Sequence, residues 1–380
     1  MTTQAALDAR APAPWRTRWQ ALRDRLLTDP RIRRRALAFA PTRWIARRRA
    51  RALFDIVAGF VYSQTLLACV QLRLFDRLAA GPDTVDVLAE RCGLAPERLQ
   101  RLLDAAVALT LLERRGPGRY GLGPLGAAMV DNPALDAMVE HHAALYADLR
   151  DPLALLQGRA GALAAYWPYD GDAPQTLPDG RVADYSALMS ASQPLVADEI
   201  LDAYPVQDHR RLLDVGGGEG LFLAAAAARA PALQLMLFDL PPVAQRAQAR
   251  LDGLGLGPRV RTFGGNFLRD ALPRGADLIS LVRVIHDQDD DDAQDLLRAA
   301  HDALPPGGVL LLAEPMAGTA GAETMGDAYF GLYLLAMGQG RPRSAAELAQ
   351  RLRAAGFALV QQRPTRLPLQ TGLLIARRKL

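Results

Sequence analysis

Alternating glycines follow an apolar run in this 380-residue sequence and are its strongest candidate for chemistry, D-V-G-G-G-E-G at 214–220. Glycine lets a ligand approach the backbone closely and adopts backbone angles that other residues avoid. The alanine-rich stretch that follows predicts a helix about 219–230, whose first N–H groups point at a bound ligand. Asp239 ends the next apolar run, near the spacing at which an acidic side chain accepts from ribose hydroxyls. These features together predict a cradle for a nucleotide cofactor.

The same stretch favours a cationic ligand over a dinucleotide. The dinucleotide fingerprint G-x-G-x-x-G would need a third glycine where this chain has Leu221. Asp214 stands two positions before Gly216, and its carboxylate suits positive charge on the ligand better than a pyrophosphate. The pattern D-x-G-x-G-x-G, which includes Gly218, resembles motif I of the S-adenosylmethionine-dependent methyltransferases. We therefore expect S-adenosyl-L-methionine, whose sulfonium and ammonium are cationic, as the cofactor.

A histidine and a glutamate end two further apolar runs. His286 closes L-V-R-V-I-H at 281–286, and Glu314 closes the run after it. A neutral imidazole is the usual side chain for accepting a proton near pH 7, and a carboxylate can hold its other nitrogen. We predict that His286 is a general base supported by Glu314. The alternative, a histidine with a purely structural role, stays open.

Six aspartates lie between positions 287 and 295. Five of them fall in one short loop and first helical turn, so they do not converge as metal ligands would. Negative charge at a helix N-terminus is stabilised by the helix dipole. We interpret this run as helix N-terminal charge and expect an enzyme that uses no metal.

Strand and helix patterns alternate through the second half of the chain and place these residues. Alternation of this kind predicts a Rossmann-like, mostly parallel sheet of seven strands, which binds ligands outside the strands' carboxyl ends. The glycine cradle, Asp239, His286 and Glu314 all fall at such ends. The predicted strands are 211–215, 234–239, 259–263, 277–285, 308–313, 357–361 and 372–376, and the predicted helices are 219–230, 242–252, 289–303 and 344–355.

Residues 52–134 show the order of elements of a winged helix. Thr84 can cap a short helix, and Pro96 suits the first turn of the next helix, whose apolar residues share one face. The sequence Gly-Pro-Gly at 116–118 predicts a hairpin turn, the wing. Because the helix face is apolar and the domain is not basic, we expect no nucleic-acid binding here.

The basic charge of the chain is concentrated at its N-terminus. Residues 1–51 hold 14 Arg and three Asp, a net charge of +11, which leaves −7 in residues 52–380 against a total of +4. Three of the four tryptophans, Trp15, Trp19 and Trp44, lie in the same leader. Arginine interleaved with tryptophan is typical of helices that contact anionic membrane surfaces. A solvated basic tail and a nucleic-acid-binding arm are the alternatives.

Cysteine content and hydropathy favour a cytoplasmic protein, peripheral at the membrane if the leader binds lipid. Cys69 and Cys92 form neither a metal set nor a disulfide framework, and no signal peptide is evident. The longest uncharged run, residues 56–72, has 17 residues and includes four polar ones. We interpret it as a buried helix that falls short of a membrane span.

Several motifs together resemble the plant-type small-molecule O-methyltransferases over about residues 52–380. They are F-D-L-P at 238–241, G-G-N-F at 264–267, V-I-H-D at 284–287 and A-E-P at 313–315. The resemblance implies an N-terminal all-helical winged-helix domain at 52–134 that forms a homodimer. It also implies a catalytic domain at 204–380 whose His286 deprotonates the acceptor hydroxyl. The cofactor-binding positions are expected at Asp214, Gly216, Gly218, Asp239, Leu240, Asn266, Phe267 and Arg283.

The chain departs from the plant pattern at three positions. Asn266 replaces an aspartate expected to contact adenine, and Gln288 replaces an aromatic residue. Pro342 occupies the position of a second glutamate that flanks the catalytic histidine. Glu314 is therefore expected to be the only carboxylate that supports His286.

The acceptor pocket is expected to be apolar. Met325, Tyr329, Phe330, Tyr333 and Met337 share one predicted helix, with Met189 opposite in a helical connector at 135–203, although this stripe also suits an ordinary core. Within the family, the stretches 166–171 and 185–193 and the basic leader resemble the bacterial carotenoid branch. That resemblance implies methylation of the 1-hydroxy group of an acyclic carotenoid. A soluble phenol or polyketide acceptor, and a cofactor-sensing winged-helix regulator without catalysis, are the alternatives.

Overall fold

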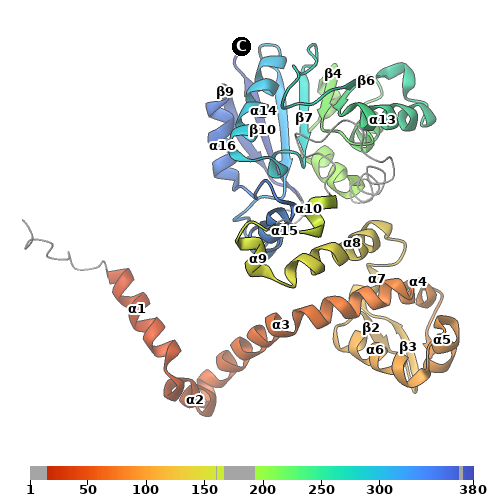
Figure 1. Cartoon of the computed structure of the whole chain (residues 1–380), viewed down its shortest axis with the longest axis vertical. Helices are drawn as coiled ribbons and strands as arrows, with labels where there is room; N and C mark the ends of the chain where they lie inside the picture. Colours follow the sequence, from red (N-terminus) through yellow and green to blue (C-terminus); the bar gives the residue numbers. More distant parts are fainter. Residues whose placement is uncertain (1–14, 160, 167–192, 368–370) are drawn as a thin grey trace, which may run out of the picture. The chain divides into compact units, whose positions relative to one another are not determined.

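The computed structural model describes residues 15–159, 161–166, 193–367 and 371–380 (Figure 1). The chain divides into two compact units, Met1–Ala127 and Ala128–Leu380. The finer division into leader, dimerisation domain, connector and catalytic domain stays a prediction.

The first unit is helical apart from a three-stranded sheet in the order β1-β3-β2. Thr84 caps α5 by accepting from the Val87 N–H, and Pro96 begins α6, as predicted. The hairpin pairs Leu112 with Leu122 across the turn at 116–118, which confirms the wing. Its elements are α1 (Trp15–Thr28), α2 (Pro30–Ala38), α3 (Ala40–Gln71), α4 (Leu74–Ala79), β1 (Asp83–Thr84), α5 (Val85–Cys92), α6 (Pro96–Ala108), β2 (Leu112–Arg114), β3 (Arg119–Leu122) and α7 (Pro124–Ala127).

Helix α3 corrects one expectation. Its C-terminal part is buried at Thr65, Cys69 and Val70, but Ile56 is 79% exposed and Phe60 67% exposed. The prediction of a buried helix is therefore wrong for the first half of the apolar run. By length and composition alone, α3 could cross a membrane, and only 22% of its apolar window is buried. Hydrophobic sequence shows which side chains avoid water, and it does not show what covers them.

The second unit is built on a seven-stranded sheet in the order β6-β5-β4-β7-β8-β10-β9. Strands β4 to β8 are parallel, and β10 runs antiparallel to both of its neighbours. All seven predicted strands are present. They are β4 (Arg211–Val215), β5 (Gln234–Asp239), β6 (Val260–Gly264), β7 (Leu278–Val282), β8 (Val309–Glu314), β9 (Phe357–Arg363) and β10 (Gly372–Arg378).

Alternate residues of the strands enter two cores, one on each face of the sheet. Leu212 packs with α12, α13 and the helical residues 193–203, whereas Leu213 packs with α14 and α16. Figure 1 shows α16 beside β9 and α13 beside β6. Burial on both faces explains why these strands read as continuous apolar runs. The four helices named here are α12 (Leu221–Arg229), α13 (Pro241–Gly253), α14 (Asp290–Ala303) and α16 (Ala345–Ala354).

The remaining helices complete this unit. The predicted helix that carries Tyr329 and Tyr333 consists of a π-helical segment, η4 (Thr324–Tyr329), that continues into α15 (Phe330–Met337). π-helical segments of this kind are frequent at functional sites. The others are α8 (Pro133–Leu149), α9 (Pro152–Leu156), α10 (Ala162–Tyr166), and the 3-10 turns η1 (Val206–Asp208), η2 (Gly257–Arg259) and η3 (Ile285–Asp287).

Candidate active site

The glycine cradle lies where β4, the strand of the glycine motif, is flanked by β5 on one side and β7 on the other. The direction of chain crossover reverses at this point, which is where open α/β sheets bind ligands. Gly216 has a φ of +67°, and a Cβ there would lie 2.7 Å from the Val284 side chain. A side chain at this position is therefore excluded, which leaves the backbone of the loop accessible to a ligand.

Asp214 is the buried acid of this cradle, with a residue exposure of only 2%. Ser280 Oγ donates to its Oδ1 at 2.6 Å, and its Oδ2 has no hydrogen-bond partner among the described residues. A Cβ on Gly217 would stand 2.7 Å from that free oxygen. Burial raises the pKa of Asp214 to about 7, although the Ser280 hydrogen bond opposes the shift. A buried, half-satisfied carboxylate facing a side-chain-free loop fits the cationic part of S-adenosylmethionine.

Asp239 holds the other side of the cradle. It accepts from the Gly218 N–H at 2.9 Å and from the Leu240 N–H at 2.7 Å, which fixes the glycine loop to the end of β5. Burial raises its pKa to about 6. Each carboxylate oxygen keeps a further lone pair with which to accept from ribose hydroxyls.

Asn266 and Phe267 follow β6 at the same edge. Asn266 Oδ1 accepts from the Leu268 N–H at 2.9 Å, so the side-chain oxygen is used within its own turn. The amide NH₂ is then the part of Asn266 that can reach a ligand, as a donor. Phe267 is half-buried and packs on the core that lies on the α14 side of the sheet.

His286 does not end β7, as its apolar run predicted. The strand stops at Val282 because Arg283 adopts a left-handed φ of +59°, and His286 lies in the following turn, η3. A non-glycine residue with such a φ is uncommon and marks local strain. The Arg283 N–H donates to the Ala313 carbonyl at 2.8 Å, which keeps the turn attached to β8.

Glu314 reaches His286 from the end of β8, as predicted. Its Oε2 contacts His286 Nδ1, and its Oε1 accepts from the N–H groups of Val284 and Ile285 at 3.1 and 2.7 Å. The expectation that Glu314 is the only carboxylate on the ring is wrong. Asp287 Oδ1 lies 3.0 Å from His286 Nε2, because the 3-10 turn folds the next side chain back onto the imidazole.

Arg343 is a further buried residue at the site, and its role was not predicted from the sequence. It is 2% exposed and donates to the carbonyls of Ile285 and Gln288, each at 2.7 Å. Asp290 balances its charge at 2.8 Å, so that aspartate does more than stabilise a helix terminus. Within the described residues, no three His, Cys, Asp or Glu side chains gather as metal ligands do.

The predicted acceptor residues form a row of rings that begins at the imidazole. Phe330 lies 5.9 Å from the His286 ring centroid, and Tyr329 lies 5.1 Å from Phe330. Tyr333 then stacks on Tyr329 with centroids 5.7 Å apart. Met325 is half-buried in the π-helical segment, and Met337 is buried in the adjoining core. Met189 lies outside the described residues.

Two histidines of α8 pair with the tyrosines of this row, and they too were missed from sequence. His142 Nε2 lies 2.7 Å from the Tyr329 hydroxyl, and His141 Nε2 lies 3.0 Å from the Tyr333 hydroxyl. Burial lowers the pKa of His141 to about 4 and raises the pKa of Tyr329 to about 12. Burial also lowers the pKa of His142, so His141, His142 and Tyr329 are neutral at pH 7. Adjacent histidines at 141–142 were the only sequence signal, and it does not specify a partner.

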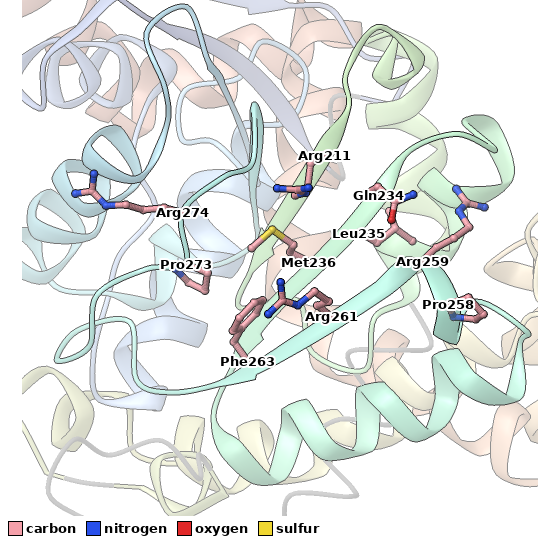
Figure 2. A pocket seen from close by; sticks show the side chains of 10 residues that line it. All are labelled: Arg211, Gln234, Leu235, Met236, Pro258, Arg259, Arg261, Phe263, Pro273 and Arg274. Atoms are coloured by element: carbon pink, nitrogen blue, oxygen red, sulfur yellow. The ribbon is translucent and has the colours of Figure 1, made fainter.

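A separate pocket lies at the opposite edge of the same sheet. It has a volume of about 320 Å³ near the starts of β4 and β5, and Figure 2 shows Arg261 and Met236 in its wall. Arg211, the first residue of β4, contributes to it, whereas Asp214 is at the other end of that strand. The pocket is thus distinct from the cofactor cradle.

Two parts of the chain match known families. Residues 54–132 match the O-methyltransferase dimerisation domain, and residues 174–358 match the O-methyltransferase domain. With the parallel sheet and the glycine cradle, these matches define the class. The chain belongs to the plant-type O-methyltransferase family and is an S-adenosylmethionine-dependent O-methyltransferase, and its dimerisation domain supports a homodimer.

Among its relatives is the demethylspheroidene O-methyltransferase of Cereibacter sphaeroides, 48% identical over 320 residues, or 84% of either chain. The enzyme of the same name from Rhodobacter capsulatus is 45% identical over 88% of this chain and 84% of its own. The structure of human N-acetylserotonin methyltransferase in complex with SAM superposes with a TM-score of 0.73. That comparison covers 87% of this chain and 98% of the human chain at 24% identity, and it shows the shared fold.

Proposed function

We propose that this enzyme methylates the 1-hydroxy group of an acyclic carotenoid of the demethylspheroidene or 1-hydroxyneurosporene type, with His286 as the general base. The observation that carries the proposal is the row of aromatic rings that starts at His286 and continues through Phe330 to Tyr329. An extended polyene packs favourably along such faces, with its hydroxyl end at the imidazole. The names of the two relatives above support the same substrate.

The cofactor-binding roles follow from the cradle. We assign the cationic end of the cofactor to Asp214, the close backbone approach to Gly216 and Gly218, and the ribose hydroxyls to Asp239. The remaining contacts are assigned to Leu240, Asn266, Phe267 and Arg283. The bound cofactor supplies an electrophilic methyl group.

The proton of the acceptor hydroxyl goes to His286 Nε2. Glu314 fixes the ring by accepting from Nδ1–H, which leaves the Nε2 lone pair as the base in the neutral imidazole. A tertiary alcohol holds its proton more tightly than a phenol does, so deprotonation is concerted with attack on the methyl carbon. Charge is dispersed in this displacement, so alignment and exclusion of water contribute most to the rate.

A choice of acceptors tests the substrate proposal. Methyl transfer from labelled S-adenosylmethionine is expected to be faster, in kcat/KM, for a 1-hydroxy acyclic carotenoid in detergent than for simple phenols. The reverse order would favour the second candidate, a soluble phenolic or polyketide acceptor. A matched variant, Tyr333→Ala, shortens the aromatic row and should raise KM for the carotenoid more than for a one-ring phenol.

The leader has a function under this proposal, because a long hydrocarbon acceptor resides in the membrane. Trp15, Trp19 and Trp44 are each more than 60% exposed. Arginines are interspersed with them along α1, α2 and the start of α3. Exposed indoles among cations match the boundary of an anionic bilayer. We propose that residues 1–51 dock the enzyme at the membrane surface.

Pelleting with vesicles tests this docking. Removal of residues 1–51 is expected to weaken binding to anionic vesicles by more than about 100-fold, since each arginine near such a surface contributes about 1 kcal/mol. Trp15→Ala/Trp19→Ala/Trp44→Ala in the full-length chain should weaken it less. Leu254→Ala, which removes an exposed apolar residue elsewhere, is the control. Equal pelleting of the full-length and shortened chains would show that the leader is not the anchor.

A further inference from the structure

The second carboxylate at the catalytic histidine is supplied by the residue next to it in sequence. Family resemblance places that carboxylate at 342, where this chain has Pro342. In the structure, Asp287 Oδ1 lies 3.0 Å from His286 Nε2, on the side of the ring opposite Glu314. The side chains of His286 and Asp287 are 7% and 14% exposed, so this contact is only slightly screened by water.

The segment that would have carried the second glutamate instead holds the turn by donating to its main-chain carbonyls. The Arg341 N–H donates to the His286 carbonyl at 2.9 Å, and Arg343 donates to the Ile285 carbonyl. A Cβ on Gly340 would lie 2.2 Å from the His286 carbonyl oxygen, so the two segments are in direct contact. This clamp fixes the turn and thereby the placement of Asp287 beside the ring.

Two carboxylates in contact with the ring constrain its protonation. A carboxylate only accepts hydrogen bonds, so contacts at Nδ1 and Nε2 together favour an imidazolium that donates to both. Among the described residues, the charged groups in contact with the ring are Glu314 from β8 and Asp287 from its own turn, while Phe330 adds an apolar ring. The Arg343 guanidinium is occupied by carbonyls and by Asp290. A ring that donates from Nε2 cannot also take the acceptor's proton there.

We propose that Asp287 is a positioning residue that holds Nε2 of His286 in the acceptor-free enzyme and yields that nitrogen to the acceptor hydroxyl. As the acceptor enters, the Nε2 proton passes to Asp287 and from there to water. The hydroxyl proton then moves to Nε2 while the oxygen–carbon bond forms and the carbon–sulfur bond breaks. After the transfer, the protonated Nε2 again donates to Asp287. This proposal rests on the proposed role of His286 as base.

The pH dependence of kcat/KM, which reports on the free enzyme, tests the proposal. Burial by itself lowers the pKa of His286, but Asp287 and Glu314 outweigh it and raise the pKa to about 10. Asp287→Asn keeps the shape and removes one negative charge, so the acid limb should move to lower pH by at least about one unit. Asp291→Asn removes an exposed charge from the next helix and should leave the limb in place.

Histidine NMR gives a readout that does not need activity. The chain has five histidines, and His286→Ala identifies the resonance of His286 in the full-length enzyme bound to S-adenosylhomocysteine. We expect that resonance to titrate at lower pH in Asp287→Asn than in the wild type, and unchanged in Asp291→Asn. Equal titration in the wild type and Asp287→Asn would overturn the role of Asp287. If the titration shifts but His286→Ala stays active, the contact is real and the proposed base is wrong.

Discussion

Replacing His286 with alanine is expected to lower kcat for methyl transfer by about 10²- to 10⁴-fold, the range typical of a lost general base. The ring is the group that the structure places between Glu314 and the aromatic row. Because His286 is not part of the glycine cradle, its loss should change the affinity for S-adenosylhomocysteine little. Single-turnover transfer of a labelled methyl group measures the first quantity, and calorimetry measures the second.

Two further variants sharpen this result. His301→Ala removes a histidine of α14 that packs on Phe357 and should leave the rate unchanged. Glu314→Gln keeps an acceptor near Nδ1 but loses the charge, so its rate should lie between those of the wild type and His286→Ala. An alanine variant as fast as the wild type would mean that another group, or water, removes the hydroxyl proton.

Asp214→Asn is expected to weaken binding of S-adenosylmethionine about 10- to 100-fold, since a hydrogen bond to a charged group contributes roughly 1.5–3 kcal/mol. The structure leaves Asp214 Oδ2 buried and without a partner among the described residues, which is costly unless a ligand supplies one. Calorimetric titration with the cofactor measures the loss. An unchanged affinity would place the cationic end of the cofactor elsewhere.

The raised pKa of Asp214 also predicts how cofactor binding depends on pH. Burial raises the pKa of Asp214 to about 7, so cofactor affinity should rise as pH increases through 7 and the carboxylate ionises. In the cofactor-free protein, the same ionisation has the opposite effect, because it lowers the stability of the folded state. A raised pKa favours the folded state at low pH, and that stability is lost between about pH 4 and pH 7 as the buried group becomes charged. Thermal melts with and without S-adenosylhomocysteine should therefore diverge as the pH rises.

Ser280→Ala provides the matched control for this pH dependence. Ser280 Oγ donates to Asp214 Oδ1 and thereby opposes the upward shift in pKa. Its loss should move the rise in affinity to higher pH, whereas Asp214→Asn should flatten the rise altogether. If the rise persists in Asp214→Asn, the titrating group is a different one, and Asp239 is the next candidate.

The sequence by itself determined the elements whose signals are local. Glycine spacing, the acidic residues at strand ends and the continuous apolar runs specify the parallel sheet and its binding edge, because two-sided burial and backbone geometry act within a few residues. The cap at Thr84 and the turn at 116–118 are local in the same sense. Glu314 could be expected beside His286 because Glu314 ends one strand and His286 follows the neighbouring strand at the same edge of the sheet.

Only the tertiary structure decided which groups complete the site. The pairs formed by His142 with Tyr329 and by His141 with Tyr333 join residues 187 and 192 positions apart, and Arg343 reaches a carbonyl 58 positions away. No spacing rule predicts such contacts, because they depend on how separate helices pack. Asp287 is adjacent to His286 in sequence, yet its side chain reaches Nε2 only because a left-handed residue ends β7 early and the chain turns. Hydrophobic and polar patterns determine which side chains leave water, whereas packing in three dimensions determines what each one meets.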